Sequence, residues 1–413
     1  MSARKLIEID EARGIVLETV RMLSPEAVAL GSALGRVLAE DVIADEPVPA
    51  FDNSAMDGFA VRAGDIAAAA AAAPVRLRLV GESRAGRPSE RTLQGGEAIA
   101  ISTGAMLPRG ADAVVRLEDV RATDGVVEVS SAVREGREVR RAGEDIAPGL
   151  HVLERGSALG PAQLGVLASL GRSEALCTPR PRVAVLVTGD ELIAAAERPR
   201  AGSVRDTSTH SIGALARCAG GELSASALIP DDAQHTVAAL AAARESADVI
   251  VVCGGVSVGR HDHVRPALDQ LGARQAFWGI ALKPGRPTWF GTLGETLVFG
   301  LPGNPVSAMV TFALLVRPAL RALQGARNDD GGRSAVFDRD YEKPAGRAHA
   351  VRCSLHARAD GWHADPTGAQ GSHVLTSMLG ADALAMMPTK ATIVRAGERV
   401  LIEPLDWCAG VIA

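Results

Sequence analysis

The sequence has few aromatic residues, no excess of positive charge and no closely spaced cysteines. Aromatic side chains make up only 3% of the 413 residues, and Tyr341 is the single tyrosine. Stacking platforms that bind single-stranded nucleic acid are therefore not expected. Lysine and arginine number 44 against 49 acidic residues, a net charge of −5, which predicts neither nucleic acid nor an anionic membrane as a partner. Any anionic ligand must be held by local cations, backbone amides or a metal.

The cysteines are scattered and odd in number, and no targeting segment is evident. No C-x-x-C pair occurs among Cys177, Cys218, Cys253, Cys353 and Cys408, which favours reduced thiols over a zinc site or a disulfide framework. The start, MSARKLIEIDEARG, lacks an apolar core of signal-peptide length. No uninterrupted apolar run reaches the roughly 20 residues of a membrane-spanning helix. We expect a soluble cytoplasmic protein.

The length favours two to four domains, and composition divides the chain into four regions. The first forty residues predict helix, turn, helix and then a short strand, and residues 147–180 return to helix, so 1–46 with 147–180 form one discontinuous helical region. Short β segments between glycine and proline breakers predict a β-rich domain over 47–146. After the polar linker QGARNDDGGRS, short strands and turns predict a small β-barrel domain over 328–413.

Residues 181–327 alternate short apolar runs with helical runs. RVAVLVTG, ELSASALI and ADVIVVCGG are typical of buried strands, and STHSIGALARCAGG and DDAQHTVAALAAARES of helices. This alternation predicts an α/β domain with a mostly parallel, doubly wound sheet, which gives a multidomain α/β plus β fold class. Such sheets bind ligands at the carboxyl ends of their strands. We therefore expect TGDEL, after the first strand, and GGVSVG, after the third, to face one crevice.

A glycine-rich loop, GGVSVGRHD, follows the third of these strands. Gly254 and Gly255 let the backbone approach an oxyanion closely. Ser257 adds a hydroxyl, and Asp262 adds a carboxylate before the next helix. The loop is neither a Walker loop nor a dinucleotide fingerprint, and Asp262 could simply cap the helix. Taken alone, the loop is weak evidence for an oxyanion site.

Two further loops carry groups suited to an anion. In ALKPGRP, Lys283 and Arg286 are each followed by a proline that stiffens the turn, so two cations are displayed at little entropic cost. This favours an oxyanion clamp over an ordinary solvated pair. In GLPGNPVSAMVTF, Asn304 and Pro305 predict a capped helix start. Such a start needs no ligand, but its exposed amides form an anion site.

Carboxylates in turn-like contexts accompany these loops. They are Asp57, Asp145, Glu191, Asp231 and Asp232. Each alone would most often be a cap, a turn residue or a surface charge. Lining one pocket, they would repel an anionic substrate unless a divalent cation intervened. Because Mg²⁺ takes a few protein oxygens together with phosphate oxygens, the combination predicts Mg²⁺.

Read together, these motifs resemble the molybdopterin molybdenumtransferase family, whose eukaryotic relative is the E domain of gephyrin. The matching strings run in family order over nearly the whole chain: PVPAFDNSAMDGFAVR, STGAMLPRGADAVV, RRAGEDI, VTGDEL, GGVSVGRHDHV, ALKPGRP, GLPGNPVSAMVTF and AQGSHVLTSM. The resemblance implies an elongated homodimer of four-domain subunits, with the helical region in dimerisation. The site would lie between the α/β domain of one subunit and the β-rich segment of the other.

The implied reaction converts adenylylated molybdopterin and molybdate to molybdenum cofactor and AMP, with a divalent cation. Carried over by motif, Asp262 and Ser257 would hold the metal and the pterin phosphate region beside Gly254 and Gly255, with Glu191 as a second metal ligand. Molybdate would be held by Lys283, Arg286, Arg352 and Ser372. The functionally sensitive carboxylates and hydroxyl would be Asp57, Thr103, Asp145, Glu191, Asp231 and Asp262, and the loop would be shaped by Pro302, Asn304 and Pro305.

The sequence departs from the family pattern at a few positions. Gly279 stands where a cation is expected after the aromatic pair, and Arg286 stands where the family often has lysine. His261 and His263 flank Asp262, and we expect both imidazoles to be exposed rather than to support the site. These differences bear on oxyanion affinity rather than on the family.

Three alternatives stay open at this point. The first is molybdopterin adenylyltransferase, for which a GGTG loop and a short single-domain chain would be expected. The second is a non-catalytic scaffold of the gephyrin E-domain type, in which the oxyanion and carboxylate elements would be idle. The third is tungstate in place of molybdate, since the two oxyanions are nearly isosteric. Protein partners could include the adenylyltransferase and apo-molybdoenzymes.

Overall fold

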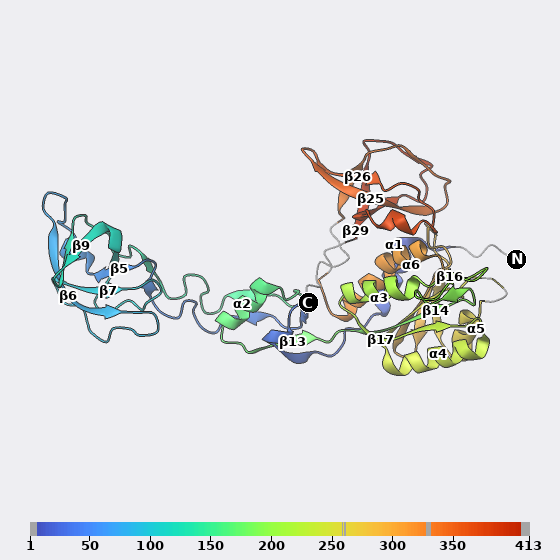
Figure 1. Cartoon of the computed structure of the whole chain (residues 1–413), viewed down its shortest axis with the longest axis horizontal. Coiled ribbons are helices and arrows are strands. Elements are labelled where there is room, and N and C mark those ends of the chain that lie inside the picture. The colour runs from blue at the N-terminus through green and yellow to red at the C-terminus, as the bar shows by residue number, and fades with distance from the viewer. Residues whose placement is uncertain (1–5, 258, 260–261, 328–331, 406–413) are drawn as a thin grey trace. The chain divides into compact units, whose positions relative to one another are not determined.

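The computed structural model describes residues 6–257, 259, 262–327 and 332–405. The chain forms two compact units (Figure 1). The first unit contains Met1–Glu40, Arg155–Pro161 and Glu174–Ala413, and the second contains Asp41–Glu154 and Ala162–Ser173. The boundaries of the four domains expected from the sequence stay a prediction.

The first unit is built on a six-stranded sheet in the order β17-β14-β18-β22-β21-β19. The first four strands run parallel, while β21 and β19 add an antiparallel edge. The predicted doubly wound, mostly parallel sheet is therefore confirmed. The strands are β14 (Arg182–Thr188), β17 (Glu222–Ile229), β18 (Val249–Cys253), β19 (Arg274–Trp278), β21 (Trp289–Leu293) and β22 (Thr296–Leu301), with a small parallel pair β15 (Leu192–Ile193) and β16 (Val204–Arg205).

Alternate residues of each central strand enter two different hydrophobic cores, because successive side chains of a strand point to opposite faces. In β14, Val183, Val185 and Val187 join one core, and Ala184 and Leu186 join the other. Helices therefore cover both faces, α4 and α5 on one side and α1, α3, α6 and α7 on the other (Figure 1). The helices are α1 (Ile9–Thr19), α3 (Ser208–Cys218), α4 (Ala233–Ser246), α5 (Val264–Gln270), α6 (Pro305–Thr311) and α7 (Arg317–Leu323).

A π-helical turn, Phe312–Val316, joins α6 to α7 and is buried throughout. The resulting helix, Pro305–Leu323, is long and apolar enough to cross a membrane by length and composition alone. However, 72% of its apolar window is buried inside the protein, as expected for the central helix of a domain core.

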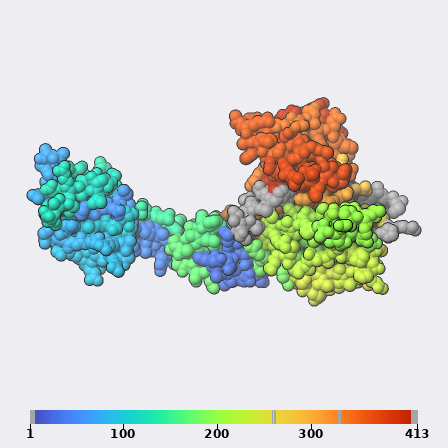
Figure 2. Space-filling view, in the orientation of Figure 1, coloured from blue at the N-terminus to red at the C-terminus, as the bar shows by residue number. Residues whose placement is uncertain are grey.

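The C-terminal strands form a closed five-stranded barrel, in the order β25-β26-β23-β29-β27, with β27 pairing back onto β25. This confirms the predicted small β-barrel. The barrel contacts the α/β sheet region directly, because β20 pairs with β25 and the Ala348 amide donates to the Ala281 carbonyl (Figure 2). The elements are β20 (Leu282–Lys283), β23 (Ser334–Phe337), β24 (Tyr341–Glu342), β25 (Ala348–Arg358), β26 (Gly361–Pro366), a 3-10 turn Leu375–Met378, β27 (Ala383–Met387), β28 (Ile393–Val394) and β29 (Arg399–Pro404).

The second unit confirms the predicted β-rich segment. Its six-stranded sheet has the order β8-β5-β7-β6-β10-β9, and two short pairs, β4 with β11 and β3 with β12, flank it in sequence. The elements are β3 (Val42–Ile43), β4 (Asn53–Ser54), β5 (Gly58–Val61), β6 (Val75–Ser83), β7 (Glu97–Ile101), β8 (Ala113–Arg116), β9 (Val120–Thr123), β10 (Val126–Val129), β11 (Val139–Arg140), β12 (His151–Leu153), and 3-10 turns Ala63–Ile66 and Leu117–Asp119.

The expected second N-terminal helix is wrong, and residues 147–180 are only partly helical. After α1 the chain forms β1 (Glu26–Ala29), a 3-10 turn Leu30–Ser32 and β2 (Val37–Leu38), and both strands pair with β13 (Glu174–Thr178). The later segment contains one helix, α2 (Pro161–Ser169), between β12 and β13. Strand pairing with a distant segment overrides the helical propensity of the EAVA run.

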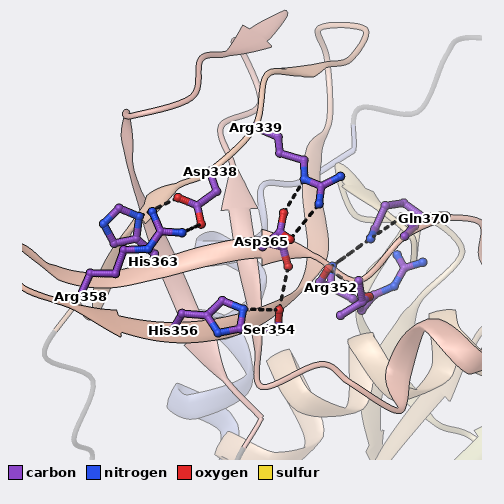
Figure 3. Close-up of polar contacts among 11 residues, drawn as sticks. Asp338, Arg339, Arg352, Ser354, His356, Arg358, His363, Asp365 and Gln370 are labelled. Carbon is purple, nitrogen blue, oxygen red and sulfur yellow. Dashed lines mark hydrogen bonds and ion pairs between the residues drawn. The ribbon is translucent and has the colours of Figure 1, made fainter.

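A polar cluster on the barrel gives it a pH-sensitive contact (Figure 3). The buried His363 ring lies between two carboxylates, with Nδ1 2.6 Å from Asp338 Oδ1 and Nε2 2.9 Å from Asp360 Oδ1. Arg358 also donates to Asp338 at 2.8 Å. The hydrogen bond with Asp338, and then that with Asp360, raises the pKa of His363.

The barrel is expected to lose stability as the pH rises. Because the pKa of His363 is raised in the folded state, its stabilising contribution is complete below the ordinary value near 6.5 and is lost as the pH passes through the raised pKa. Hydrogen-exchange protection in β26, corrected for intrinsic rates, should fall as the pH rises above the ordinary histidine value near 6.5. His363→Gln should abolish this fall, and His356→Gln, at the exposed Ser354 contact, should keep it. An unchanged pH response in His363→Gln would contradict the assignment.

Candidate functional site

A cavity of about 280 Å³ lies where β14, β18 and β22 end. Each strand contributes the loop at its carboxyl end, so the predicted crevice shared by TGDEL and GGVSVG is confirmed. The cavity is lined by Thr188, Gly189, Glu191, Asp231, Gly254, Gly255, Val256, Ser257, Asp262, Pro287, Pro302 and Gly303.

The two glycines after β18 hold conformations that side chains rarely adopt. Gly254 has φ +94° and Gly255 has φ +65°. A Cβ on Gly254 would lie 2.8 Å from the Thr188 hydroxyl and 2.9 Å from its carbonyl, and a Cβ on Gly255 would lie 2.7 Å from Val264. Glycine is therefore required for the loop to pass this close to β14 and α5.

Acidic side chains line the cavity, and the lining residues that the structure describes include no cation. Glu191 and Asp231 come from neighbouring loops, which are tied together because the Asp231 amide donates to Asp190 Oδ1 at 2.9 Å. Asp232 has a different role. Its carboxylate accepts from the His235 amide at 2.9 Å and caps α4. Of the two adjacent aspartates in LIPDDAQ, Asp231 therefore lines the cavity and Asp232 caps a helix.

Asp262 does not cap α5. That helix begins at Val264, and the residue in its N-cap position, His263, makes no side-chain cap. Instead, Asp262 Oδ2 accepts from the Gly259 amide at 2.6 Å, so the carboxylate closes the glycine-rich loop and lies on the cavity wall. His263 is half-buried, against the expectation that it is exposed. His261 lies outside the described residues.

Lys283 and Arg286 are exposed, and among the described residues neither forms an ion pair with a carboxylate. They do not line the cavity, although Pro287 next to Arg286 does. Gly279, where a cation was expected, has φ +87°, and a Cβ there would lie 2.9 Å from Leu6 Cδ2. The positive φ and the close contact with Leu6 therefore explain why glycine rather than a cationic residue stands at position 279.

Lys283 is in register with a buried histidine of the barrel. β20 pairs Lys283 with His349. Burial first, and then the charges of Lys283, Lys343 and Arg347, lower the pKa of His349 to about 4. His349 is therefore neutral at physiological pH. The positive charge near Lys283 comes from Lys283 itself, Lys343 and Arg347.

The predicted helix start at Asn304 and Pro305 is confirmed, but the asparagine side chain does not cap it. Its Nδ2 donates to Ser372 Oγ of the barrel segment at 3.1 Å. Pro302 and Gly303, just before, line the cavity. The structure therefore joins the helix start to Ser372, although neither Asn304, Pro305 nor Ser372 lines the cavity itself.

Arg352, expected to hold molybdate, is fully buried and makes no contact with a carboxylate among the described residues. Its guanidinium donates to Ser377 Oγ at 3.1 Å and to the Gly371 carbonyl at 3.1 Å. Burial lowers its pKa. The Arg352 side chain thus contacts the segment that carries Ser372, at Gly371 and Ser377.

The remaining predicted residues belong to the second unit. Asp57 Oδ1 accepts from the Thr103 amide at 2.7 Å and from the Thr103 hydroxyl at 3.0 Å, and these bonds lower the pKa of Asp57. Asp145 is exposed. Asp52 accepts from Arg141 at 2.7 Å and from the Ala142 amide at 2.8 Å, so it joins the FDNSAMDG and RRAGEDI motifs within this unit.

Sequence reasoning missed several residues that line the cavity or hold its loops together. Thr188 is the last residue of β14 and presents a hydroxyl at the strand end. That position was a usable signal, since strand ends face the ligand in such sheets. Asp190, which ties two loops, and Pro287 and Gly303 carry no comparable signal, because their roles depend on contacts between distant segments.

The fold and site define a multidomain α/β protein whose glycine-rich and carboxylate-bearing loops meet at the ends of parallel strands, with a β-barrel packed on the same unit. Family models match three successive parts: the MoeA N-terminal region (domain I and II) at residues 7–171, the probable molybdopterin binding domain at 184–322, and the MoeA C-terminal region (domain IV) at 334–405. The chain belongs to the molybdopterin molybdenumtransferase (MoeA) family.

Similar proteins match over nearly the full length. The molybdopterin molybdenumtransferase of Haemophilus influenzae is 36% identical over 98% of this chain and 100% of its own. That of Bacillus subtilis is 33% identical, with 94% and 91% covered. The crystal structure of the molybdopterin biosynthesis MoeA protein from Pyrococcus horikoshii has a TM-score of 0.82 at 32% identity, covering 97% of this chain and 99% of that one.

Proposed function

We propose that this chain inserts molybdenum from molybdate into adenylylated molybdopterin, releasing molybdenum cofactor and AMP in a Mg²⁺-dependent reaction. As a member of its family it is a molybdotransferase that acts on molybdopterin. The observation that supports the detailed reaction is the cavity. In it, a glycine-rich loop suited to phosphate lies beside Glu191, Asp231 and Asp262, and the described lining residues include no cation. An anionic substrate needs a divalent ion to bind there.

The donor set fits Mg²⁺ better than a transition metal. The described residues contain no group of three or more histidine, cysteine or acidic side chains that could form a closed protein cage. Mg²⁺ commonly uses one or two carboxylates and completes its shell with water and substrate phosphate oxygens. Asp262 and Glu191 would hold it, and the ion would neutralise charge on the phosphate bridge between pterin and adenylate.

The protein groups then act by position and charge. The backbone at Gly254 and Gly255, with the Ser257 hydroxyl, would hold the phosphate region. Lys283, Arg286 and Ser372 would bind molybdate, with Arg352 beneath Ser372. Cleavage of a phosphoanhydride requires neutralised charge and alignment more than covalent catalysis, so no nucleophilic side chain is needed.

We further propose a cytoplasmic homodimer in which Asp57, Thr103 and Asp145 of one subunit complete the site of the other. The apolar helix α2 buries only Leu167 in the single chain. Exposed apolar side chains also surround the Asp57 motif, namely Phe51, Met56 and Met106. Both features suit burial by a second copy. Transfer of the product to apo-molybdoenzymes, and receipt of substrate from the adenylyltransferase, would follow from the same chemistry.

The direct test supplies purified protein with adenylylated molybdopterin, Mg²⁺ and either molybdate or tungstate. AMP release and reconstitution of an apo-molybdoenzyme with molybdate are the expected results, and the tungstate arm measures oxyanion preference. Consumption of ATP without molybdate would instead identify an adenylyltransferase. If the folded dimer shows neither activity, the non-catalytic scaffold is the alternative that remains.

A further inference from the structure

The guanidinium of Arg352 is buried, and no carboxylate among the described residues pairs with it, although a buried charge is normally paired. It is fully buried, and in the described part of the chain its partners are the Ser377 hydroxyl and main-chain carbonyls. A buried charge that is hydrogen-bonded but not neutralised is costly. The contacts that the guanidinium makes instead, to the Ser377 hydroxyl and to the carbonyls of Ala369 and Gly371, fix the 369–377 segment.

A second side chain fixes the same segment to the backbone of Arg352. β26 ends at Pro366, opposite Cys353, one residue before its register would reach Arg352. The Thr367 amide still donates to the Arg352 carbonyl at 2.9 Å, but the Arg352 amide needs another acceptor. Gln370 Oε1 accepts from that amide at 2.9 Å, and Gln370 Nε2 donates to the Arg352 carbonyl at 3.2 Å (Figure 3).

The Gln370 amide thus takes the place of the missing strand residue. A primary amide offers one acceptor and two donors in one plane, and Nε2 also reaches the Gly368 carbonyl at 3.1 Å. Gln370 therefore holds the backbone of Arg352 while the Arg352 side chain reaches the carbonyls on both sides of Gln370, at Ala369 and Gly371. Each residue fixes the other.

The 369–377 segment carries Ser372, whose hydroxyl accepts from Asn304 at the start of α6. Ser377 closes the far end of the segment, since its hydroxyl accepts from Arg352 Nε and donates to the Val374 carbonyl at 2.6 Å. Two anchors, Gln370 before Ser372 and Ser377 after it, therefore set the position of Ser372 relative to α6.

We propose that Gln370 and Ser377 are positioning residues for the oxyanion, acting through Arg352 to fix Ser372 against Asn304. This inference rests on the proposed function, in which Ser372 contacts molybdate. Neither residue need touch substrate. Their removal should weaken capture of the oxyanion and leave the phosphate-binding cavity, which they do not line, unaffected.

The test separates the two substrates in steady-state kinetics of the full-length enzyme. Gln370→Leu keeps the side-chain size but leaves the Arg352 amide without its acceptor, so the KM for molybdate should rise about tenfold. The kcat and the KM for adenylylated molybdopterin should stay within about twofold of wild type. Ser377→Ala removes the other anchor and should shift the same constant in the same direction. Thr376→Ala, an exposed neighbour, should behave as wild type.

Molybdate binding by calorimetry distinguishes failure of this inference from failure of the proposed function. Wild-type protein that does not bind molybdate would overturn both. Weak binding by Ser372→Ala with wild-type binding by Gln370→Leu and Ser377→Ala would overturn the positioning role alone. A fall in kcat and a rise in both KM values together would also overturn it, because that pattern reports general loss of structure.

Discussion

Asp262→Asn is expected to lower kcat for molybdenum insertion at least about a hundredfold while the protein remains folded, because electrostatic groups at a reacting centre commonly contribute that much. Asparagine keeps an oxygen that can accept from the Gly259 amide, the contact that closes the glycine-rich loop. It removes the negative charge proposed to hold Mg²⁺. The substitution therefore separates metal binding from loop closure.

The measurement is AMP release as a function of Mg²⁺ concentration, with thermal unfolding as the check on folding. The variant should need much more Mg²⁺, and Asp262→Ala should be at least as impaired. Asp269→Asn changes an exposed carboxylate on α5, the helix that follows the loop, and should leave the rate unchanged. A wild-type rate and Mg²⁺ requirement in Asp262→Asn would remove Asp262 from the mechanism.

Gly254→Ala is expected to reduce activity at least about a hundredfold and to destabilise the protein by about 1–3 kcal/mol, the usual range for backbone strain. The new methyl group would meet the backbone carbonyl of Thr188 at 2.9 Å and would sit on a residue with φ +94°. Either the loop or the end of β14 must shift. Both line the cavity, so the phosphate region cannot keep its shape.

Gly272→Ala is the matched control, since Gly272 has φ +78° but no atom within 4 Å of its added Cβ. It should lose stability through the same backbone strain and keep its activity. Chemical unfolding and AMP release measure the two effects separately. Equal activity of the Gly254→Ala and Gly272→Ala variants would show that close packing of the loop on β14 is not needed for function.

Much of the α/β domain was predictable because local patterns determine it. The alternation of buried runs and helices required a parallel sheet, and a parallel sheet brings the loops after β14 and β18 to one edge. The shared cavity therefore followed from Gly254 and Glu191 standing just after strands, without knowledge of any contact.

Features that depend on distant partners could not be predicted. Glu26–Ala29 has a composition that favours helix, yet it forms a strand because β13 lies beside it. Asn304 stands where an N-cap is expected, but its side chain bonds Ser372, 68 residues away. The register that ends β26 before Arg352 leaves an amide for Gln370 to satisfy. None of these contacts produces a periodic pattern of residues from which it could be predicted.

The two-residue strand β20 belongs to the barrel's sheet in space, although it lies in the α/β region of the sequence. Lys283 belongs by sequence to the α/β region, yet its strand is bonded to β25, and β25 also carries Arg352. A rigid displacement of the barrel would carry the lysine turn and the Arg352 anchor as one body. Cutting the polypeptide at the linker near residue 328 would therefore divide this body, and an isolated barrel would lack one strand of its own sheet.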